Sequence, residues 1–221
     1  MWTPEHFRAA TPEWDAELVG QCPFGLLVTS NDSTPEATHV PMLIHPDDRE
    51  RAATGLTGCR ILGHLARLNS HWTRIEESQP ALLVFPGVHG YVSPTVYGEH
   101  PAAPTWNYAA VHVTGPITLV HDPKETMTVI DRTIDVLEGS GPAAHWDREP
   151  SRDYFDQIIR GVVAFEVRAD KVESSYKLSQ DQPPDRRAAA VEASARQGRD
   201  PGSLGHWMSV AAHAQKEPRS E

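Results

Sequence analysis

A histidine beside a glycine is the first feature of this sequence that could do chemistry. It lies in Gly63–Trp72, which reads G-H-L-A-R-L-N-S-H-W. Glycine lets another group approach the backbone closely, and a neutral imidazole at His64 can ligate iron. Taken alone, the pattern favours a plainer interpretation, in which His64 is partly buried and bonded to a backbone carbonyl.

Aromatic residues dominate the second segment that could bind a ligand. It comprises Tyr91–Tyr97 (Y-V-S-P-T-V-Y) and Ala103–Tyr108 (A-P-T-W-N-Y). Aromatic walls with a few polar groups suit a flat conjugated ligand. Ordinary core packing at the end of a barrel explains the same residues equally well.

A lysine with hydrogen-bonding neighbours marks the third segment, Tyr176–Gln182 (Y-K-L-S-Q-D-Q). Lys177 supplies a cation, and Ser179 and Gln180 supply hydrogen-bonding groups that could hold a carboxylate, a propionate or a phosphate. The alternative is a solvated turn after a strand, because lysine is usually exposed.

Other features of the sequence exclude whole classes of function. It contains no phosphate loop, dinucleotide-binding glycine motif, zinc-protease motif or nucleophile elbow. The formal net charge of −10 repels nucleic acid, so we expect no DNA binding. Two cysteines without metal-site spacing, no signal-peptide pattern and no apolar run of about 20 residues predict a cytoplasmic protein that does not enter the membrane.

Hydrophobic periodicity predicts an initial helix, several strands, two helices, one more strand and a tail. The expected strands are Gly25–Ser30, Ala37–Ile44, Leu56–Leu65, Ala81–Gly87, Thr105–Asp122 and Val162–Arg168. The expected helices are Pro4–Val19, Arg152–Arg160 and a segment that starts at Asp122 and carries Met127, Ile130, Ile134 and Leu137 at helical spacing.

This order of elements does not alternate strand with helix, so it predicts no doubly wound sheet. It favours a mainly β fold with flanking helices (α+β), an antiparallel β-barrel with helices packed at its ends. We expect one cofactor-binding domain over residues 1–182. Residues 183–221 are expected to form a C-terminal tail that is helical or partly disordered.

Together and in this order, the three segments resemble the PaiB family, described as FMN-binding proteins similar to negative transcriptional regulators. Each motif is short, but their joint order is specific. The matching motifs are Pro4–Phe7 (P-x-x-F), Thr38–Pro41 (T-H-V-P), Gly63–Asn69 (G-H-x-A-R-x-N), Tyr91–Pro94 (Y-x-S-P), Pro104–Tyr108 (P-T-W-N-Y) and Lys177–Gln180 (K-L-S-Q). The resemblance implies a split antiparallel β-barrel like that of FMN-binding proteins, and a homodimer with cofactor sites near the subunit interface.

Two departures from the common PaiB pattern remove cations. Between Tyr97 and Pro104 the family usually has a longer loop with lysines, whereas this chain has only G-E-H-P-A-A. Before K-L-S-Q the family often has another lysine, whereas this chain has Glu173–Tyr176 (E-S-S-Y). A flavin phosphate needs cationic or amide partners, so both departures count against FMN.

The departures make the chain similar to a subgroup of the family, the haem-dependent piperazate synthases. Those enzymes share the short Y-x-x-x-P-A-A-P-T-W-N loop and the K-L-S-Q-x-Q ending. This resemblance implies a haem b with His64 as its axial ligand. It also implies that N5-hydroxy-L-ornithine is converted to L-piperazate, with loss of water and formation of an N–N bond.

The resemblance assigns expected roles to several further residues. We expect Trp106 and Asn107 to line the cofactor cavity, together with Arg67. Lys177 is a candidate partner for a haem propionate or for the substrate carboxylate. His39 is the first candidate for proton transfer. Thr38, Arg67 and Tyr91 compete with Lys177 and His39 for these roles.

Two other functions fit the same sequence. One is an FMN-binding, PaiB-like regulator or flavin-binding protein, which is the usual description of the family. The other is a haem-degrading oxygenase on the same type of barrel. The colour of the purified protein separates flavin from haem, and release of biliverdin identifies the oxygenase.

Overall fold

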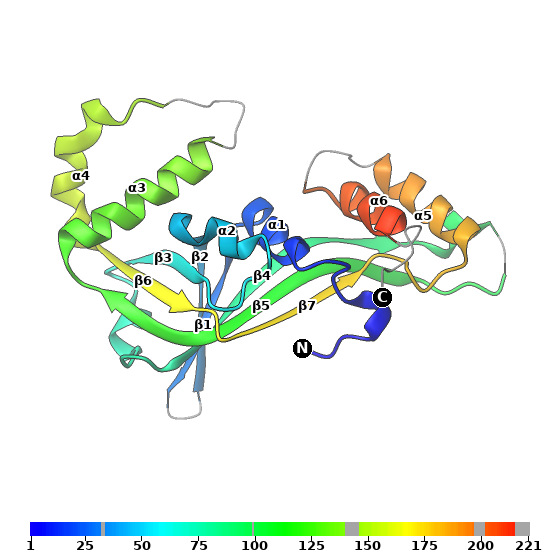
Figure 1. Ribbon diagram of the computed structural model, residues 1–221, viewed down its shortest axis with the longest axis horizontal. Helices are drawn as coiled ribbons and strands as arrows, with labels where there is room; N and C mark the ends of the chain where they lie inside the picture. Colours follow the sequence, from blue (N-terminus) through cyan, green and yellow to red (C-terminus); the bar gives the residue numbers. More distant parts are fainter. Residues whose placement is uncertain (32–33, 99, 140–145, 197–201, 215–221) are drawn as a thin grey trace. The chain divides into compact units, whose positions relative to one another are not determined.

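The computed structural model describes residues 1–31, 34–98, 100–139, 146–196 and 202–214 (Figure 1). The chain divides into two compact units. Unit 1 comprises Met1–Cys22, Phe85–His112 and Glu173–Glu221, and unit 2 comprises Pro23–Val84 and Val113–Val172. The described part of the expected tail, 183–221, therefore belongs to unit 1, and the residues expected to be disordered at its end lie outside the described residues.

Antiparallel strands form the body of unit 2. They are β1 (Phe24–Asn31), β2 (Thr34–Ile44), β3 (Arg60–Ala66), β6 (Val162–Arg168) and the unit 2 parts of β4 (Pro80–Val92) and β5 (Thr105–Val120). Their order is β4-β1-β2-β3-β6-β5. Ile117 of β5 exchanges backbone hydrogen bonds with Ser78 and Gln79, just before β4, and this contact joins the two ends of the strand order. The predicted antiparallel barrel fold is confirmed.

Strand alternation gives the unit 2 barrel an inner and an outer face. On β3 and β6, the paired residues Ile61 and Val167 are fully buried, as is Phe165 opposite Gly63. The alternate residues, including His64 opposite Ala164, point to the outer face. This alternation comes directly from the apolar and polar pattern of each strand, and it decides on which face each candidate residue lies.

Helix α3 (Pro123–Gly139) covers part of the outer face of unit 2 through contacts with β2, β3 and β6. Unit 2 also holds α2 (Arg49–Ala52), α4 (Arg152–Ile158) and the 3-10 turns Pro46–Asp48, Ser70–Arg74, Glu149–Ser151 and Ile159–Gly161. Val129 of α3 packs on Leu43, Leu62 and Ala164, and Val136 adds to the same cluster. Helix α3 thus buries Leu62 and Ala164, which share the outer face with His64.

Unit 1 packs three helices on the remaining strand segments. It holds the 3-10 turns Glu5–Phe7 and Pro94–Tyr97, α1 (Glu13–Gln21), α5 (Pro184–Ala195), α6 (Leu204–Ala214) and the unit 1 parts of β4, β5 and β7 (Lys171–Lys177). Helices α5 and α6 lie side by side (Figure 1). Trp14, Tyr176 and Trp207 form a buried aromatic cluster, with ring centroids 5.1–5.6 Å apart.

Several predicted elements differ from those observed. The first α-helix begins at Glu13 rather than Pro4, because Pro12 stands directly before it and ends the preceding turn structure. The third strand begins at Arg60 rather than Leu56, because Gly58 adopts a φ of +82° in a turn. Strand β7 was not predicted, and the C-terminal segment contains helices α5 and α6. None of the helices in the described residues is long and apolar enough to cross a membrane.

Candidate functional site

His64 lies on the outer face of unit 2, inside β3. It pairs with Ala164 of β6 across the sheet, and its neighbour Gly63 pairs with Phe165 on the inner face. A Cβ atom at Gly63 would lie 2.3 Å from Cζ of Phe165, so the group that approaches this glycine is the core phenyl ring. Gly63 and Phe165 thus fix the strand that presents His64.

The His64 imidazole has one nitrogen that no protein group satisfies. Its Nδ1 atom is fully buried without a hydrogen-bond partner, while the side chain as a whole is partly exposed. The expected backbone carbonyl partner is therefore missing at this atom. Burial lowers the pKa of His64, so the ring stays neutral below the pH at which an exposed histidine becomes protonated. A neutral imidazole with an accessible nitrogen is the form that ligates iron.

His39 lies on the same outer face as His64. Met42 of β2 pairs with Gly63 of β3 on the inner face, and alternation along each strand then places both histidines on the opposite side. His39 is exposed and stacks on Phe24, with ring centroids 5.8 Å apart and an interplanar angle of 19°. Phe24 is itself 59% exposed. The face therefore carries two imidazoles beside an exposed aromatic ring.

Arg67 is fixed to the start of β6. Its guanidinium donates to the carbonyls of Arg160 (2.9 Å) and Val162 (3.1 Å) and lies 5.1 Å from the centroid of the Trp72 ring. Trp72 in turn donates its indole N–H to the Arg67 carbonyl at 2.8 Å. These contacts hold the end of β3 in place, and the role of Arg67 toward a cofactor stays a prediction.

A second histidine of the first segment, His71, lies inside the protein. It is fully buried, and its two ring nitrogens lie 2.8 Å from the hydroxyls of Thr29 and Thr38. The Asn69 amide donates to the same Thr38 hydroxyl at 3.1 Å. Because these groups satisfy one another, the end of the Gly63–Trp72 segment holds the loop after β3 against β1 and β2.

The aromatic segment presents an exposed platform on unit 1. Trp106 and Tyr91 are 51% and 57% exposed. His89 stacks on Trp106 at 5.7 Å with an interplanar angle of 27°, and the Tyr91 ring lies 6.3 Å from the indole. Half-exposed rings gathered on one sheet face offer a flat apolar surface of the kind that a planar ligand contacts.

The lysine segment lies against the aromatic segment in unit 1. Lys177 Nζ donates to the Thr105 hydroxyl and, at 3.1 Å, to the Trp106 carbonyl. Asn107 points the other way: it is fully buried, and its amide donates to the Ser179 hydroxyl at 2.8 Å. The structure thus brings these two predicted segments together, and it places His39, His64 and Arg67 in the other unit.

Hydrogen bonds from the Gln180 side chain shape the turn after β7. Its carbonyl accepts from the Leu178 amide at 2.6 Å, and its amide donates to the Tyr176 carbonyl at 2.5 Å. Ser179 adopts the left-handed conformation, with a φ of +71°. The K-L-S-Q motif is therefore a built turn rather than a solvated one.

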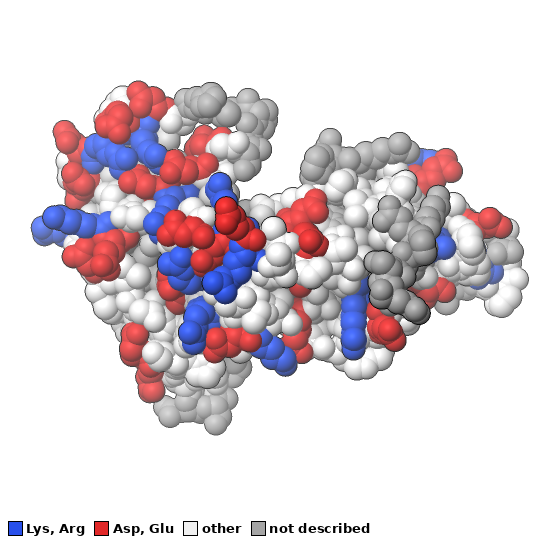
Figure 2. Space-filling view, viewed as in Figure 1, with Lys and Arg blue, Asp and Glu red and all other residues white. Residues whose placement is uncertain are grey.

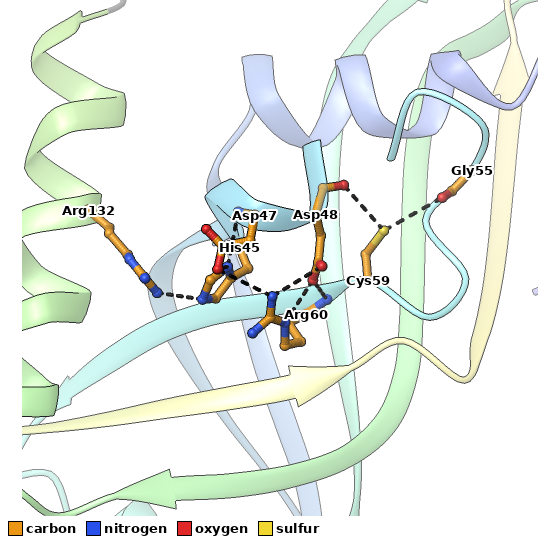
Figure 3. Close-up of polar contacts among 7 residues, drawn as sticks. All are labelled: His45, Asp47, Asp48, Gly55, Cys59, Arg60 and Arg132. Carbon is orange, nitrogen blue, oxygen red and sulfur yellow. Dashed lines mark hydrogen bonds and ion pairs between the residues drawn. The ribbon is translucent and has the colours of Figure 1, made fainter. Parts of the chain in front are cut away.

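A cluster of charged residues surrounds the start of α2 in unit 2 (Figure 3). Arg60 of β3 donates to both carboxylate oxygens of Asp48, at 2.9 and 3.2 Å, and its own backbone N–H binds the same group. The buried His45 imidazole contacts the Arg132 guanidinium of α3 on one side. Burial, reinforced by Arg132 and Arg60, lowers the pKa of His45. The cluster therefore links α2, β3 and α3.

Replacing Asp48 with asparagine should destabilise the protein by about 1–3 kcal/mol at pH 7, because a charged acceptor of three hydrogen bonds is lost. Hydrogen bonds from Arg60 lower the pKa of Asp48, so its stabilising effect is present above about pH 3.9 and is lost as the pH falls through the folded-state pKa. Urea unfolding at pH 7 and pH 3 checks both statements. Asp47→Asn is the matched control, because that side chain is 68% exposed.

Charges of both signs intermix on the face shown in Figure 2. Blue and red residues alternate over the region of α2, α3 and α4, and the described residues of this face carry no continuous basic stripe. Within the described residues, no group of three or more His, Cys, Asp or Glu side chains is placed to hold a metal ion.

Comparison with known proteins places the chain in a family. Residues 1–171 match the family model described as "Putative FMN-binding domain". The chain belongs to this FMN-binding domain family. The protein named "Protease synthase and sporulation protein PAI 2" from Bacillus subtilis is 28% identical over 183 residues, which cover 82% of this chain and 83% of that protein. The predicted relationship to PaiB is confirmed at this level.

Solved structures of family-like fold are similar over most of the chain. The flavocytochrome Anf3 from Azotobacter vinelandii has a TM-score of 0.52 at 12% identity, covering 76% of this chain and 68% of that one. The conserved hypothetical protein Rv2991 from Mycobacterium tuberculosis has a TM-score of 0.54 at 11% identity, covering 83% and 94%. At these identities the likeness establishes the split-barrel fold of the FMN-binding domain family and nothing finer.

Sequence reasoning missed two residues that line a pocket beside the lysine segment, Asp181 and Arg186. Asp181 stood inside the third segment but received no role. The sequence contains no local signal for Arg186, because only the fold of α5 brings it to the Pro101–Thr105 segment. The structure thus extends the candidate site to a third group of side chains.

Proposed function

We propose that this member of the FMN-binding domain family is a haem-dependent cyclase that converts N5-hydroxy-L-ornithine to L-piperazate with loss of water. One observation carries the proposal: His64 is a neutral imidazole with a fully buried, unpartnered Nδ1 on the outer face of the barrel.

The residues around His64 fit an axial ligand. Only Nδ1 is fully enclosed, so Nε2 is the nitrogen that an iron ion can reach, and the proton then belongs on Nδ1. Neighbouring positions on the same face are apolar, namely Leu62 and Ala164. Both side chains are buried against Val129 of α3, so the open part of this face that a porphyrin could contact is the side of His39 and Phe24.

Two further observations support haem. The structural neighbours include the flavocytochrome Anf3 and, at a TM-score of 0.50, a protein described as FAD and haem binding from Mycobacterium smegmatis, so haem occurs in proteins of this fold. The two cations of the expected site, Lys177 and Arg67, already donate to protein oxygens. A flavin phosphate would have to compete for them.

The proposed conversion balances without an external oxidant. The N–O bond of the substrate breaks, the α-amine forms a bond to that nitrogen and loses a proton, and the departing hydroxide takes up a proton to leave as water. Haem iron supplies Lewis acidity at the hydroxylamine nitrogen when it is bound. The protein must bind the chain so that its two nitrogens meet, which is an entropic contribution.

Proposed roles for the protein side chains follow from where they lie. His39 is an exposed imidazole on the same face as His64 and can exchange protons with a bound ligand. Trp106 and Lys177 belong to unit 1, and their proposed roles toward a cofactor ring and toward a propionate or carboxylate stay predictions from the family resemblance. Asn107 is buried, and its hydrogen bond to the Ser179 hydroxyl holds the turn that follows Lys177.

An absorption spectrum followed by a reaction tests the proposal. Purified protein should be red with a Soret band, and incubation with N5-hydroxy-L-ornithine should yield a product lighter by one water, with the retention time of piperazate. Omitting oxygen and reductant should leave the yield unchanged, because the conversion is redox-neutral. A yellow protein with flavin fluorescence, or a red protein that leaves the substrate intact, would refute it.

The family description favours one alternative, an FMN-binding protein of the PaiB type. The exposed Trp106 and Tyr91 rings suit an isoalloxazine as well as a porphyrin. Reconstitution with FMN distinguishes the two: tight binding that His64→Ala leaves unchanged favours the flavin protein.

A further inference from the structure

The imidazole of His45 lies where helix α3 meets the rest of unit 2 (Figure 3). His45 directly follows β2 and is only 4% exposed. Its backbone N–H donates to the Arg60 carbonyl at 2.8 Å, and its carbonyl accepts from the Asp48 amide at 2.9 Å. These bonds fix the ring in place, so that Arg132 of α3 meets one defined nitrogen, Nε2.

Both ring nitrogens of His45 face N–H donors. The backbone N–H of Asp47 lies 3.2 Å from Nδ1, and the guanidinium of Arg132 contacts Nε2. A guanidinium has only donors, a neutral imidazole has one accepting nitrogen, and an imidazolium has none. The neutral ring therefore accepts one hydrogen bond, whereas the protonated ring sets a donor against a donor at both nitrogens.

Charged groups reach His45 from α3, from β3 and from the 3-10 turn that follows β2. The cations are Arg132 and Arg60, and the anions are Asp47 and Asp48. The Asp47 carboxylate lies 3.6 Å from Nδ1, but its side chain is 68% exposed and also lies 3.8 Å from Arg60. Burial, followed by the two arginines, outweighs the carboxylates, and the pKa of His45 is lowered.

Glu166 of β6 is a further charged group of this cluster, and it interacts with Arg60, Asp48 and Arg132. Burial raises the pKa of its carboxyl. Because its pKa is higher in the folded protein, a falling pH favours the folded state at Glu166, which is opposite to the effect at His45. A substitution at His45 that leaves Glu166 in place therefore separates the two effects.

The contact of α3 with the sheet is small. Its buried residues are Thr126, Val129 and Thr133. Val129 is the apolar one, and Val136 is partly buried in the same cluster. Arg132 lies three residues after Val129 and four before Val136, so all three lie on one side of the helix. Docking of α3 is therefore sensitive to the contact between Arg132 and His45.

We propose that His45 and Arg132 form a pH-sensitive switch: the neutral imidazole accepts a hydrogen bond from Arg132 and keeps α3 docked on the sheet, and protonation of the ring releases the helix. Leu62 and Ala164 lie under α3 and share the outer face with His64, so release uncovers more of that face. This movement does not depend on which cofactor the face binds.

The pH window of the switch follows from the two pKa values of His45. In the released state the ring is solvated and has a pKa of about 6.5, and in the docked state the pKa is lower. Docking is therefore complete above about pH 6.5 and weakens as the pH falls from there to the pKa of the docked state. A single proton changes the equilibrium by at most about tenfold per pH unit.

Hydrogen exchange of the backbone amides of α3 tests the switch on the full-length protein with its cofactor. Protection factors, which are corrected for the intrinsic exchange rate, should fall by up to about tenfold between about pH 7.5 and pH 5.5. In His45→Gln the fall should disappear, because glutamine accepts from Arg132 without gaining a proton. His39→Gln, at an exposed histidine that stacks on Phe24, should fall as the parent does.

A second variant keeps the histidine and removes the cation. In Arg132→Gln, the pKa of His45 measured by NMR should be higher than in the parent, and the fall in protection should be smaller. Constant protection of α3 in the parent would overturn the proposal, as would an equal fall in His45→Gln. An unchanged His45 pKa in Arg132→Gln would equally show that this contact is not the switch.

Discussion

His64→Ala is expected to give a colourless protein that neither binds haem nor turns over N5-hydroxy-L-ornithine. The imidazole is the proposed axial ligand, and alanine has no atom that bonds to iron. The fold should survive, because His64 Nδ1 makes no hydrogen bond that the variant would lose. Expression in the presence of haem, followed by the Soret absorbance per protein and by thermal unfolding, checks all three statements.

Two comparisons make this result specific to His64. His39→Ala removes the other histidine of the same face and should keep the Soret band while changing the pH dependence of turnover. Imidazole added to His64→Ala should restore part of the haem absorbance, because the small molecule can fill the space of the deleted ring. A red His64→Ala protein with the parent spectrum would contradict the assignment.

Gly63→Ala should be among the most destabilising single-methyl changes in unit 2, costing about 1–3 kcal/mol in the free energy of unfolding. The new methyl group would lie 2.3 Å from Cζ and 2.8 Å from Cε1 of Phe165, whose ring is fully buried in the core. Relief of this clash must rotate β3, and the strand carries His64. We therefore expect weaker haem binding as well as lower stability, both measured on the same preparation by urea unfolding and by haem titration.

A double variant and a control identify the cause. Gly63→Ala combined with Phe165→Leu removes the ring that the methyl meets, so the second change should cost less stability in that background than in the parent. Gly161→Ala adds the same methyl where no atom lies within 4 Å, and its stability should stay close to that of the parent. Equal effects at Gly63 and Gly161 would show that the close packing is not what constrains β3.

The strands that could be predicted are those with a clear inner face. Alternation in Val162–Arg168 and the apolar run of Ala81–Gly87 predicted β6 and the first part of β4. Strand β7 was not predicted because Lys171–Lys177 is polar along most of its length and buries a large apolar side chain only at Tyr176. Its place beside β5 comes from pairing between segments far apart in the chain, which local pattern does not encode.

Helix α3 shows a similar limit in the choice of face. The spacing of Met127, Ile130, Ile134 and Leu137 predicted the helix, yet its buried residues are Thr126, Val129 and Thr133, and Leu137 is 44% exposed. Small β-branched side chains face the sheet because α3 packs closely on Leu62 and Ala164. Periodicity establishes that a helix exists, and packing decides which of its stripes is buried.

The candidate site was predictable in its parts and not in their grouping. Residue chemistry singled out His64 and Lys177 for local reasons, a glycine neighbour and a turn motif. That Asn107 is bonded to Ser179, and that Arg186 reaches Pro101, depends on contacts across 72 and 85 residues of sequence. Such distances are set by the whole fold rather than by local periodicity.

The interleaving of the two units has a consequence for biosynthesis. Unit 2 ends at Val172, so all of its strands have been made before the last two helices leave the ribosome. Unit 1 combines α1 with α6, whose Trp14 and Trp207 pack against each other, so α1 must wait until α6 has been made. A nascent chain therefore exposes the apolar side of α1 until then, and we expect this segment, rather than the barrel, to be where chaperones engage it.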